Sequence, residues 1–249
     1  MLGKLVLLRH GQSTWNELNL FTGWHDVPLS AKGTQEAGAA GRTMKEAGLV
    51  FDVAHTSLLT RACMTGHLAL NEMDQVWLPV ERHWKWNERH YGALQGLDKK
   101  ATTEAHGEAQ TKLWRRSFDI PPPPVDMSSP EHPVNDPRYR LIDPDLLPAT
   151  ECLKDVVARV VPHFHEVVVP QLRAGMNVLV AAHGNSLRAL VMALESIPED
   201  DIAELNIPTG VPRLYNLTDS LDVAEVAYLG DQDAIKAAIE GVANQAKGH

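Results

Sequence analysis

Residues Lys4-Leu-Val-Leu-Leu8 form a continuous apolar run that ends abruptly at Arg9-His10-Gly11. A second run, Val178-Leu-Val-Ala-Ala182, ends in the same way at His183-Gly184. Uninterrupted apolar runs of this length are typical of parallel strands that are buried on both faces. The two runs therefore predict two buried strands of a parallel sheet.

Strands and helices alternate along the rest of the chain. Residues 51–56 predict a third strand, and Ser57 is predicted to cap a helix that runs through Leu70. A helical pattern covers 187–194, and two late strands are predicted near 213–217 and 223–228. The expected fold is α/β, a three-layer α/β/α sandwich with a mostly parallel central sheet of about six strands.

The length of 249 residues suits a single domain over 1–249. Nine of the sixteen prolines fall in residues 121–148. Proline at that density sustains neither a helix nor a central strand, because it lacks the N–H donor that both need. We therefore expect an irregular proline-rich insertion at about 117–149, before a helix that begins near Thr150.

The composition, 44% hydrophobic and 22% charged, is that of an ordinary globular protein. No stretch approaches the roughly 18 apolar residues of a membrane span, and the N-terminal run is too short for a signal peptide. The two cysteines, Cys63 and Cys152, show no metal-ligand spacing, which favours a reducing compartment without structural zinc. We expect a cytoplasmic protein without a membrane partner.

The charge is unevenly distributed along a chain whose net charge is −9. Residues 82–116 carry eight basic and four acidic side chains, whereas residues 189–249 carry three basic and eleven acidic ones. A nucleic acid would require a broad basic surface. This segregation instead favours a small, multiply charged anion in a focused pocket, and no nucleic-acid partner.

Both His-Gly pairs lie at the carboxyl ends of predicted strands, where ligands bind in open α/β sheets. If the two strands are neighbours, His10 and His183 meet. Ser13 and Ser186 then lie near helix N-termini, whose free N–H groups attract anions. A single His-Gly pair is more often an ordinary strand end. Two pairs in the same context favour a site.

Two arginines are expected at the same edge of the sheet. Arg9 precedes the first histidine, and Arg61 lies in the first turn after the third strand. Each alone suggests a surface ion pair. Together with two imidazoles, their planar guanidinium groups predict a pocket for a phosphoryl group in transfer. No cluster of metal ligands is apparent, so no metal is expected.

Several sequence motifs of this chain resemble the motifs of one protein superfamily. Leu8-Arg-His-Gly-Gln-Ser13 resembles the signature of the histidine phosphatase superfamily. Segments 21–24, 87–96, 182–188 and 207–212 resemble the cofactor-dependent phosphoglycerate mutases within it, and the likeness runs over about 4–230. The run Asn87-Glu-Arg-His-Tyr-Gly-Ala-Leu-Gln-Gly96 narrows the resemblance to these mutases and their bisphosphoglycerate relatives.

The resemblance implies roles for individual residues. His10 would be the nucleophile that carries the phosphoryl group, and Glu88 would exchange protons with the substrate hydroxyl. The pocket around His10 would consist of Arg9, Arg61, His183 and Asn16. The substrate carboxylate and second phosphate would be held by Tyr91, Lys99, Arg115 and Arg116. The remaining wall would comprise Ser13, Thr22, Gly23, Gly184 and Asn185.

The implied reaction is the interconversion of 2-phosphoglycerate and 3-phosphoglycerate in glycolysis and gluconeogenesis, primed by 2,3-bisphosphoglycerate without a metal. Relatives of this kind tend to be homodimers or homotetramers. Gln12 and Asp98 depart from the residues that many members carry, Glu and Asn, but neither is assigned to bond making. The tail at about 231–249, with a short helix over 233–245, is expected to order over the occupied pocket, motivated in part by Lys247.

Three alternative functions are distinguished from the mutase by residues that they should lack. A simple phosphatase of the same superfamily should lack the anion clamp that Lys99 and the two adjacent arginines supply. A bisphosphoglycerate synthase tends to lose the residues that stand here as Ser13 and Thr22-Gly23. A binding module without catalysis should have lost His10, Glu88 or His183, and all three are present.

Overall fold

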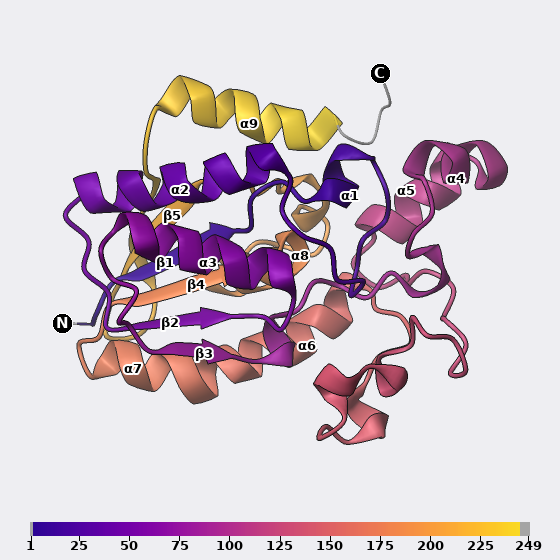
Figure 1. Cartoon of the computed structure of the whole chain (residues 1–249), viewed down its shortest axis with the longest axis horizontal. Helices are drawn as coiled ribbons and strands as arrows, with labels where there is room; N and C mark the ends of the chain where they lie inside the picture. Colours follow the sequence, from indigo (N-terminus) through magenta and orange to yellow (C-terminus); the bar gives the residue numbers. More distant parts are fainter. Residues whose placement is uncertain (1, 245–249) are drawn as a thin grey trace.

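The computed structural model describes residues 2–244 and has a central sheet of six strands in the order β3-β2-β4-β1-β5-β6 (Figure 1). The first four strands in that order run parallel, and β5 is antiparallel to both of its neighbours. This confirms the predicted mostly parallel sheet. The strand bounds are β1 Leu5–Arg9, β2 Val53–Thr56, β3 Val80–Arg82, β4 Val178–Ala182, β5 Pro212–Leu217 and β6 Val223–Tyr228.

The two apolar runs pair directly with each other. Strands β1 and β4 are parallel, with Leu5 opposite Val178 and Arg9 opposite Ala182, and all ten residues are buried. The His10 N–H continues the ladder by donating to the Ala182 carbonyl at 2.9 Å. Both His-Gly pairs therefore lie side by side, directly after the carboxyl ends of these two central strands.

Helices cover both faces of the sheet, which explains why β1 and β4 are apolar throughout (Figure 1). Val6 and Leu8 pack against α2 and α3, whereas Leu5 and Leu7 pack against α6 and α8 on the other face. Figure 1 shows α9 beside α2, outside the sheet. The long helices are α2 Ala31–Glu46, α3 Thr60–Glu72, α6 Leu153–His163, α8 Gly184–Leu194 and α9 Gln232–Asn244.

Shorter helices and turns connect these elements. The short helices are α1 Thr14–Glu17, α4 Lys99–His106, α5 Glu108–Arg116 and α7 Val169–Arg173, with a π turn at Phe164–Val168. The 3₁₀ turns are Trp84–Trp86, Gly92–Leu94, Pro133–Asn135, Pro137–Tyr139, Pro144–Leu146 and Ile202–Glu204.

The proline-rich segment 117–149 contains three 3₁₀ turns and neither a strand nor an α-helix. It is nevertheless packed, because Tyr139 and Leu147 are buried against Trp24 and Trp84 in a small apolar cluster of their own. The segment therefore packs around a second, smaller apolar core.

Three helix starts differ from the predictions. Ser57 does not cap α3, which begins at Thr60 with Leu59 as its N-cap and no side-chain cap; the Ser57 hydroxyl accepts from the Leu59 N–H and bonds His183. The helix expected near Thr150 begins at Leu153. The helix expected from 187 begins at Gly184, since the chain turns directly from β4 into α8.

Within residues 2–244, no helix is long and apolar enough to cross a membrane. The predicted tail helix is present as α9, which begins at Gln232. Lys247 lies outside the described residues.

Candidate active site

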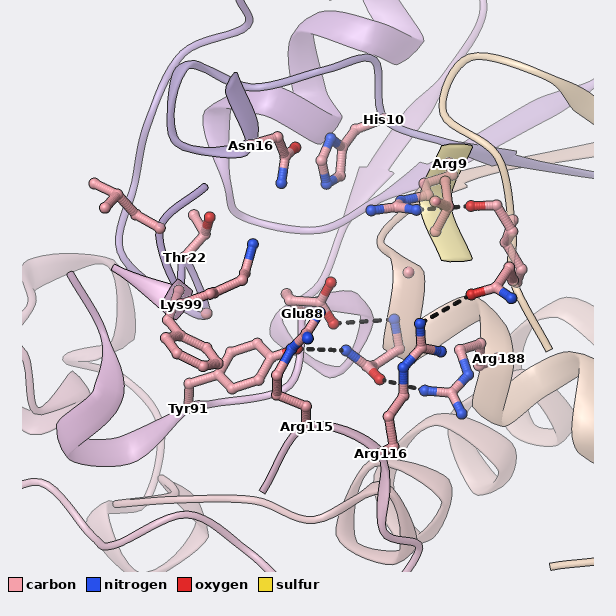
Figure 2. Close-up of a pocket in the computed structure, with 18 of the residues that line it drawn as sticks. Arg9, His10, Asn16, Thr22, Glu88, Tyr91, Lys99, Arg115, Arg116 and Arg188 are labelled. Carbon is pink, nitrogen blue, oxygen red and sulfur yellow. Dashed lines mark hydrogen bonds between the residues drawn. The ribbon is translucent and has the colours of Figure 1, made fainter. Parts of the chain in front are cut away.

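A pocket opens where β1 and β4 end (Figure 2). It encloses about 780 Å³ of empty space that communicates with solvent. Thirteen of the fifteen predicted site residues line it, all except Ser13 and His183. The other lining residues are Leu20, Phe21, Arg188, Leu205, Asn206, Ile207 and Val242.

The imidazole of His10 points into this pocket (Figure 2) and is 2% exposed. Its Nδ1 lies 2.6 Å from the Gly11 carbonyl. Because a carbonyl only accepts, Nδ1 carries the proton and Nε2 keeps its lone pair. Burial, followed by the charges of Arg61 and Arg9, holds the pKa of His10 well below its usual value. The ring is therefore a neutral nucleophile near pH 7.

His183 lies behind His10 and does not line the pocket. The two rings meet edge to face with centroids 5.0 Å apart, and His183 is fully buried. Its Nε2 bonds the Ser57 hydroxyl at 2.7 Å, and Nδ1 has no partner among the described residues. Burial, then the charge of Arg61, lowers the pKa of His183 well below the usual value. The neutral His183 ring therefore supports the His10 ring from behind.

Ser13 also lies behind the pocket wall, where it contacts Asn16. It caps the first turn of α1: its hydroxyl accepts from the Asn16 N–H at 3.1 Å, and the Asn16 side chain accepts from the Ser13 N–H at 3.1 Å. This capping box fixes the rotamer of Asn16, which is the residue that faces the pocket.

Arg9 and Arg61 approach the pocket as anchored but unneutralised cations. Arg9 donates to the Ile207 carbonyl at 2.7 Å, and Arg61 donates to the carbonyls of Gly23 at 2.7 Å and His25 at 3.0 Å. Burial lowers the pKa of Arg61 to about 10, although a nearby carboxylate partly offsets this. Since carbonyls hold the guanidinium groups, their full positive charge is available to an anion.

Glu88 is the only acidic side chain among the described lining residues and is 8% exposed. Its Oε1 accepts two backbone N–H bonds, from Arg89 at 2.8 Å and from Asn185 at 3.0 Å. The second of these donors belongs to the first turn of α8. The carboxylate is thus held at a set position beside the cations (Figure 2).

A second group of cations lies across the pocket from His10 in Figure 2. Arg116 donates to the Ala203 carbonyl at 3.1 Å and to the Asn206 side chain at 3.0 Å. We call this group the distal cations, and it consists of Lys99, Arg115, Arg116 and Arg188. Together with Arg9 and Arg61, the lining has six basic side chains and one acidic side chain, in a chain whose net charge is −9.

Two titratable groups beside the distal cations have shifted pKa values. Burial lowers the pKa of Lys99 to about 8. Burial alone would raise the pKa of Tyr91, but the Arg89 guanidinium, 4.5 Å from the ring centroid, and Arg115 bring it down to about 8. Both groups therefore change charge just above neutral pH.

Arg188 and Arg89 are site residues that the sequence analysis did not assign. Arg188 donates to the Asn185 side-chain oxygen at 3.0 Å, and burial lowers its pKa to about 9. Arg89 is fully buried beneath Tyr91. Arg188 follows Asn185 by three residues in α8, but the predicted helix began at 187 and left Asn185 outside it, so this spacing was not used.

The two departures from the common pattern have local structural roles. The Gln12 side chain accepts from the Ser30 hydroxyl at 2.9 Å. Asp98 is the N-cap of α4 and accepts from the Ala101 N–H at 2.7 Å, so it stabilises the helix whose first residue is Lys99. Within residues 2–244, no group of three or more His, Cys, Asp or Glu side chains is arranged to hold a metal ion.

Comparisons with known proteins agree with this geometry. Residues 5–135 and 130–218 match the model of the histidine phosphatase superfamily, branch 1. Among solved structures, a putative α-ribazole-5′-P phosphatase from Escherichia coli is 20% identical, covering 92% of this chain and 97% of that chain with a TM-score of 0.67. A mycobacterial glucosyl-3-phosphoglycerate phosphatase is 23% identical over 91% and 97%, with a TM-score of 0.67.

A phosphoglycerate mutase from Bacillus anthracis is 23% identical over 95% of this chain and 96% of that chain, with a TM-score of 0.65. Likeness at these identities shows a shared fold and leaves the substrate open. The match of the family model spans most of the chain, from the first strand to the fifth. The chain belongs to the histidine phosphatase superfamily, branch 1, a superfamily of phosphatases and phosphotransferases.

Proposed function

We propose that this protein interconverts 2-phosphoglycerate and 3-phosphoglycerate through a phosphohistidine at His10. The observation that carries the proposal is the second group of cations across Glu88 from His10. Transfer of one phosphoryl group requires positive charge only around the nucleophile. A mutase must in addition hold the carboxylate and the second phosphate position of the same small acid, which is what the distal cations supply.

In the proposed reaction, His10 Nε2 first attacks one phosphorus of 2,3-bisphosphoglycerate, the phosphorus–oxygen bond breaks, and a monophosphoglycerate leaves. Glu88 gives its proton to the departing oxygen. In the second step the free hydroxyl of a bound monophosphoglycerate attacks the phosphohistidine, and Glu88 takes the proton from that hydroxyl, so that 2,3-bisphosphoglycerate forms again. Transfer of its other phosphate to His10 then leaves the isomeric monophosphoglycerate. Arg9 and Arg61 stabilise the charge on the equatorial oxygens of the transferring group.

The pocket also fits 2,3-bisphosphoglycerate, which would supply the phosphoryl group that first loads His10. The buried Nε of Arg9 has no partner among the described residues, so a donor remains for one phosphate near His10. Arg115 and Arg116 would hold the other phosphate. No acidic side chain other than Glu88 among the described lining residues would repel this highly charged anion.

Hydrolysis of a phosphate ester is the second candidate, because two of the similar structures described above are phosphatases. Their chemistry would differ only in the second step, in which water replaces the glycerate hydroxyl. A bisphosphoglycerate synthase differs in its phosphoryl donor. The distal cations favour the mutase, since they retain the glycerate for the second transfer.

The test is incubation with 3-phosphoglycerate, with and without catalytic 2,3-bisphosphoglycerate, while 2-phosphoglycerate and inorganic phosphate are both measured. A mutase forms 2-phosphoglycerate in large excess over phosphate and is activated by the bisphosphate. Intact mass should show one acid-labile phosphoryl group on the peptide that contains His10. Phosphate release without 2-phosphoglycerate would reject the mutase in favour of a phosphatase.

A further inference from the structure

A buried ion pair outside the pocket lies directly beneath the segment that carries Glu88. Arg159 in α6 is 8% exposed, and Glu151 just before α6 is 3% exposed. The pair is bidentate, with Arg159 Nε 2.6 Å from Glu151 Oε1 and an Arg159 terminal nitrogen 2.9 Å from Glu151 Oε2. Removing two charges from water is costly, so such a pair calls for an explanation beyond stability.

The remaining donors of Arg159 all bind main-chain carbonyls around Glu88. They reach the carbonyls of Lys85 at 2.6 Å, Asn87 at 3.1 Å and Glu88 at 2.9 Å. Together with the two bonds to Glu151, these use all five N–H donors of a guanidinium group. A lysine could make at most three of these five bonds.

Glu151 holds the same segment from its other end. Its Oε2 accepts from the His90 N–H at 2.8 Å, and its own N–H donates to the His90 carbonyl at 2.9 Å. Residues 87–91 lie between two 3₁₀ turns and belong to no helix or strand. No repeating ladder holds this backbone, and the ion pair supplies five of the hydrogen bonds that hold residues 85–90. Trp24 Nε1 also donates to the Glu88 carbonyl at 2.5 Å. The Asn87 side chain bonds Leu58 and Tyr139.

The side chain of Glu88 is held by a neighbouring helix. Its Oε1 accepts from the Asn185 N–H at the start of α8, and α8 packs against α6. The main chain of Glu88 is therefore tied to α6, and its carboxylate to α8. This arrangement sets the distance between the proposed acid/base and the His10 side of the pocket.

We propose that Glu151 and Arg159 are positioning residues that hold the Glu88 carboxylate where it exchanges a proton with the substrate oxygen. The inference rests on the proposed role of Glu88 but not on whether the final acceptor is a glycerate or water. A misplacement of about 1 Å at an acid/base group can cost on the order of 10²-fold in rate. Arg159→Lys preserves the charge but loses the fork, so it should displace Glu88 while leaving His10 in place.

The experiment compares the first phosphoryl transfer to His10 from two donors. With 2,3-bisphosphoglycerate the leaving alkoxide oxygen is a strong base and needs the Glu88 proton. With p-nitrophenyl phosphate the leaving p-nitrophenolate is a weak base near pH 7 and departs without one. Quenched flow gives the first rate as phosphoryl group on the protein, and the burst of p-nitrophenolate gives the second.

We expect Arg159→Lys to slow transfer from 2,3-bisphosphoglycerate by on the order of 10- to 10²-fold. Transfer from p-nitrophenyl phosphate should be nearly unchanged, and KM for 3-phosphoglycerate should be retained, because the cations that bind it are not altered. The double variant Glu151→Leu/Arg159→Met replaces the ion pair with apolar side chains, a kind of change that folded proteins often tolerate. This double variant should also slow transfer from the bisphosphate and leave transfer from p-nitrophenyl phosphate unchanged. It replaces Arg159→Lys in the test if that variant does not fold.

Arg213→Lys is the matched control. Arg213 forms another partly buried pair, 2.7 Å from Glu195, at the opposite end of α8 from Asn185. It should lower stability comparably, as measured by urea unfolding, without changing the ratio of the two rates. Equal slowing with both donors in the Arg159 variants, or an unchanged ratio, would overturn the positioning role. Absence of any phosphohistidine in the wild-type protein would instead reject the proposed function.

Discussion

Replacing Glu88 with glutamine isolates the proposed proton transfer from every other contact in the pocket. The glutamine amide oxygen can still accept from the N–H groups of Arg89 and Asn185, which are 2.8 and 3.0 Å from Oε1 in the structure. The side chain should therefore stay in place. What is lost is the one acidic group among the described lining residues, so the lining charge changes from +5 to +6, counting six cations and one carboxylate.

The expected loss in kcat is on the order of 10²- to 10⁴-fold, the usual contribution of a positioned acid/base. This corresponds to about 3 to 5 kcal/mol in the activation barrier. KM for 3-phosphoglycerate should hold or fall, because the distal cations remain and one repelling charge is gone. Assays belong near pH 7: the pKa of Arg61, lowered by burial to about 10, depends partly on the Glu88 charge, and near pH 7 Arg61 stays protonated in both proteins.

Steady-state kinetics of 2-phosphoglycerate formation, with circular dichroism of both proteins in parallel, would measure these changes. A solvated carboxylate without a chemical role would leave kcat at the wild-type value. Either that result or a defect confined to KM would refute the assignment of Glu88, and with it the reason for holding its backbone so firmly.

Four further outcomes are expected. His10→Ala should remain folded, form no phosphoprotein by intact mass and lose essentially all turnover, since no other nucleophile replaces the imidazole; substantial turnover would contradict the covalent route. Adding EDTA should leave activity unchanged, because cationic side chains supply the charge; a loss that divalent ions restore would be contrary evidence. KM for 3-phosphoglycerate should rise as pH increases through about 8, where Lys99, whose pKa burial lowers, loses its positive charge and Tyr91, whose pKa burial raises but the Arg89 charge lowers overall, becomes negative. Lys99→Arg should reduce this rise and leave the part due to Tyr91; a KM independent of pH would argue against a binding role for Lys99. Deleting residues 241–249 removes Val242 from the pocket wall and should raise phosphate release relative to 2-phosphoglycerate formation; an unchanged product ratio would exclude that contribution.

Local sequence patterns were sufficient for five of the six strands and for the end of the sheet at which the candidate site lies, whereas the short strand β3 was not predicted. The apolar runs before His10 and His183 reflect burial on both faces, and that property is visible in a window of five residues. Helix starts were less accurate because competing partners decide them. Ser57 has the chemistry of a cap, but its hydroxyl bonds a histidine 126 positions away.

Only the tertiary structure decided which of the predicted site residues line the pocket and which lie behind its wall. Ser13 and His183 support the site from behind the pocket wall, and this follows from the packing of Asn16 and His10 in front of them. Arg188 enters the pocket only because α8 turns directly out of β4.

By itself, the sequence determined the α/β class, the paired His-Gly strand ends and the basic character of the 82–116 segment, because periodicity and composition are local properties of a chain. Tertiary structure alone decided that Arg159 reaches the carbonyls of residues 85–88, more than 70 positions earlier. Those carbonyls lie in a segment without regular structure, whose hydrogen-bond partners follow no repeat. Only the packing of α6 against the rest of the fold brings the arginine to them.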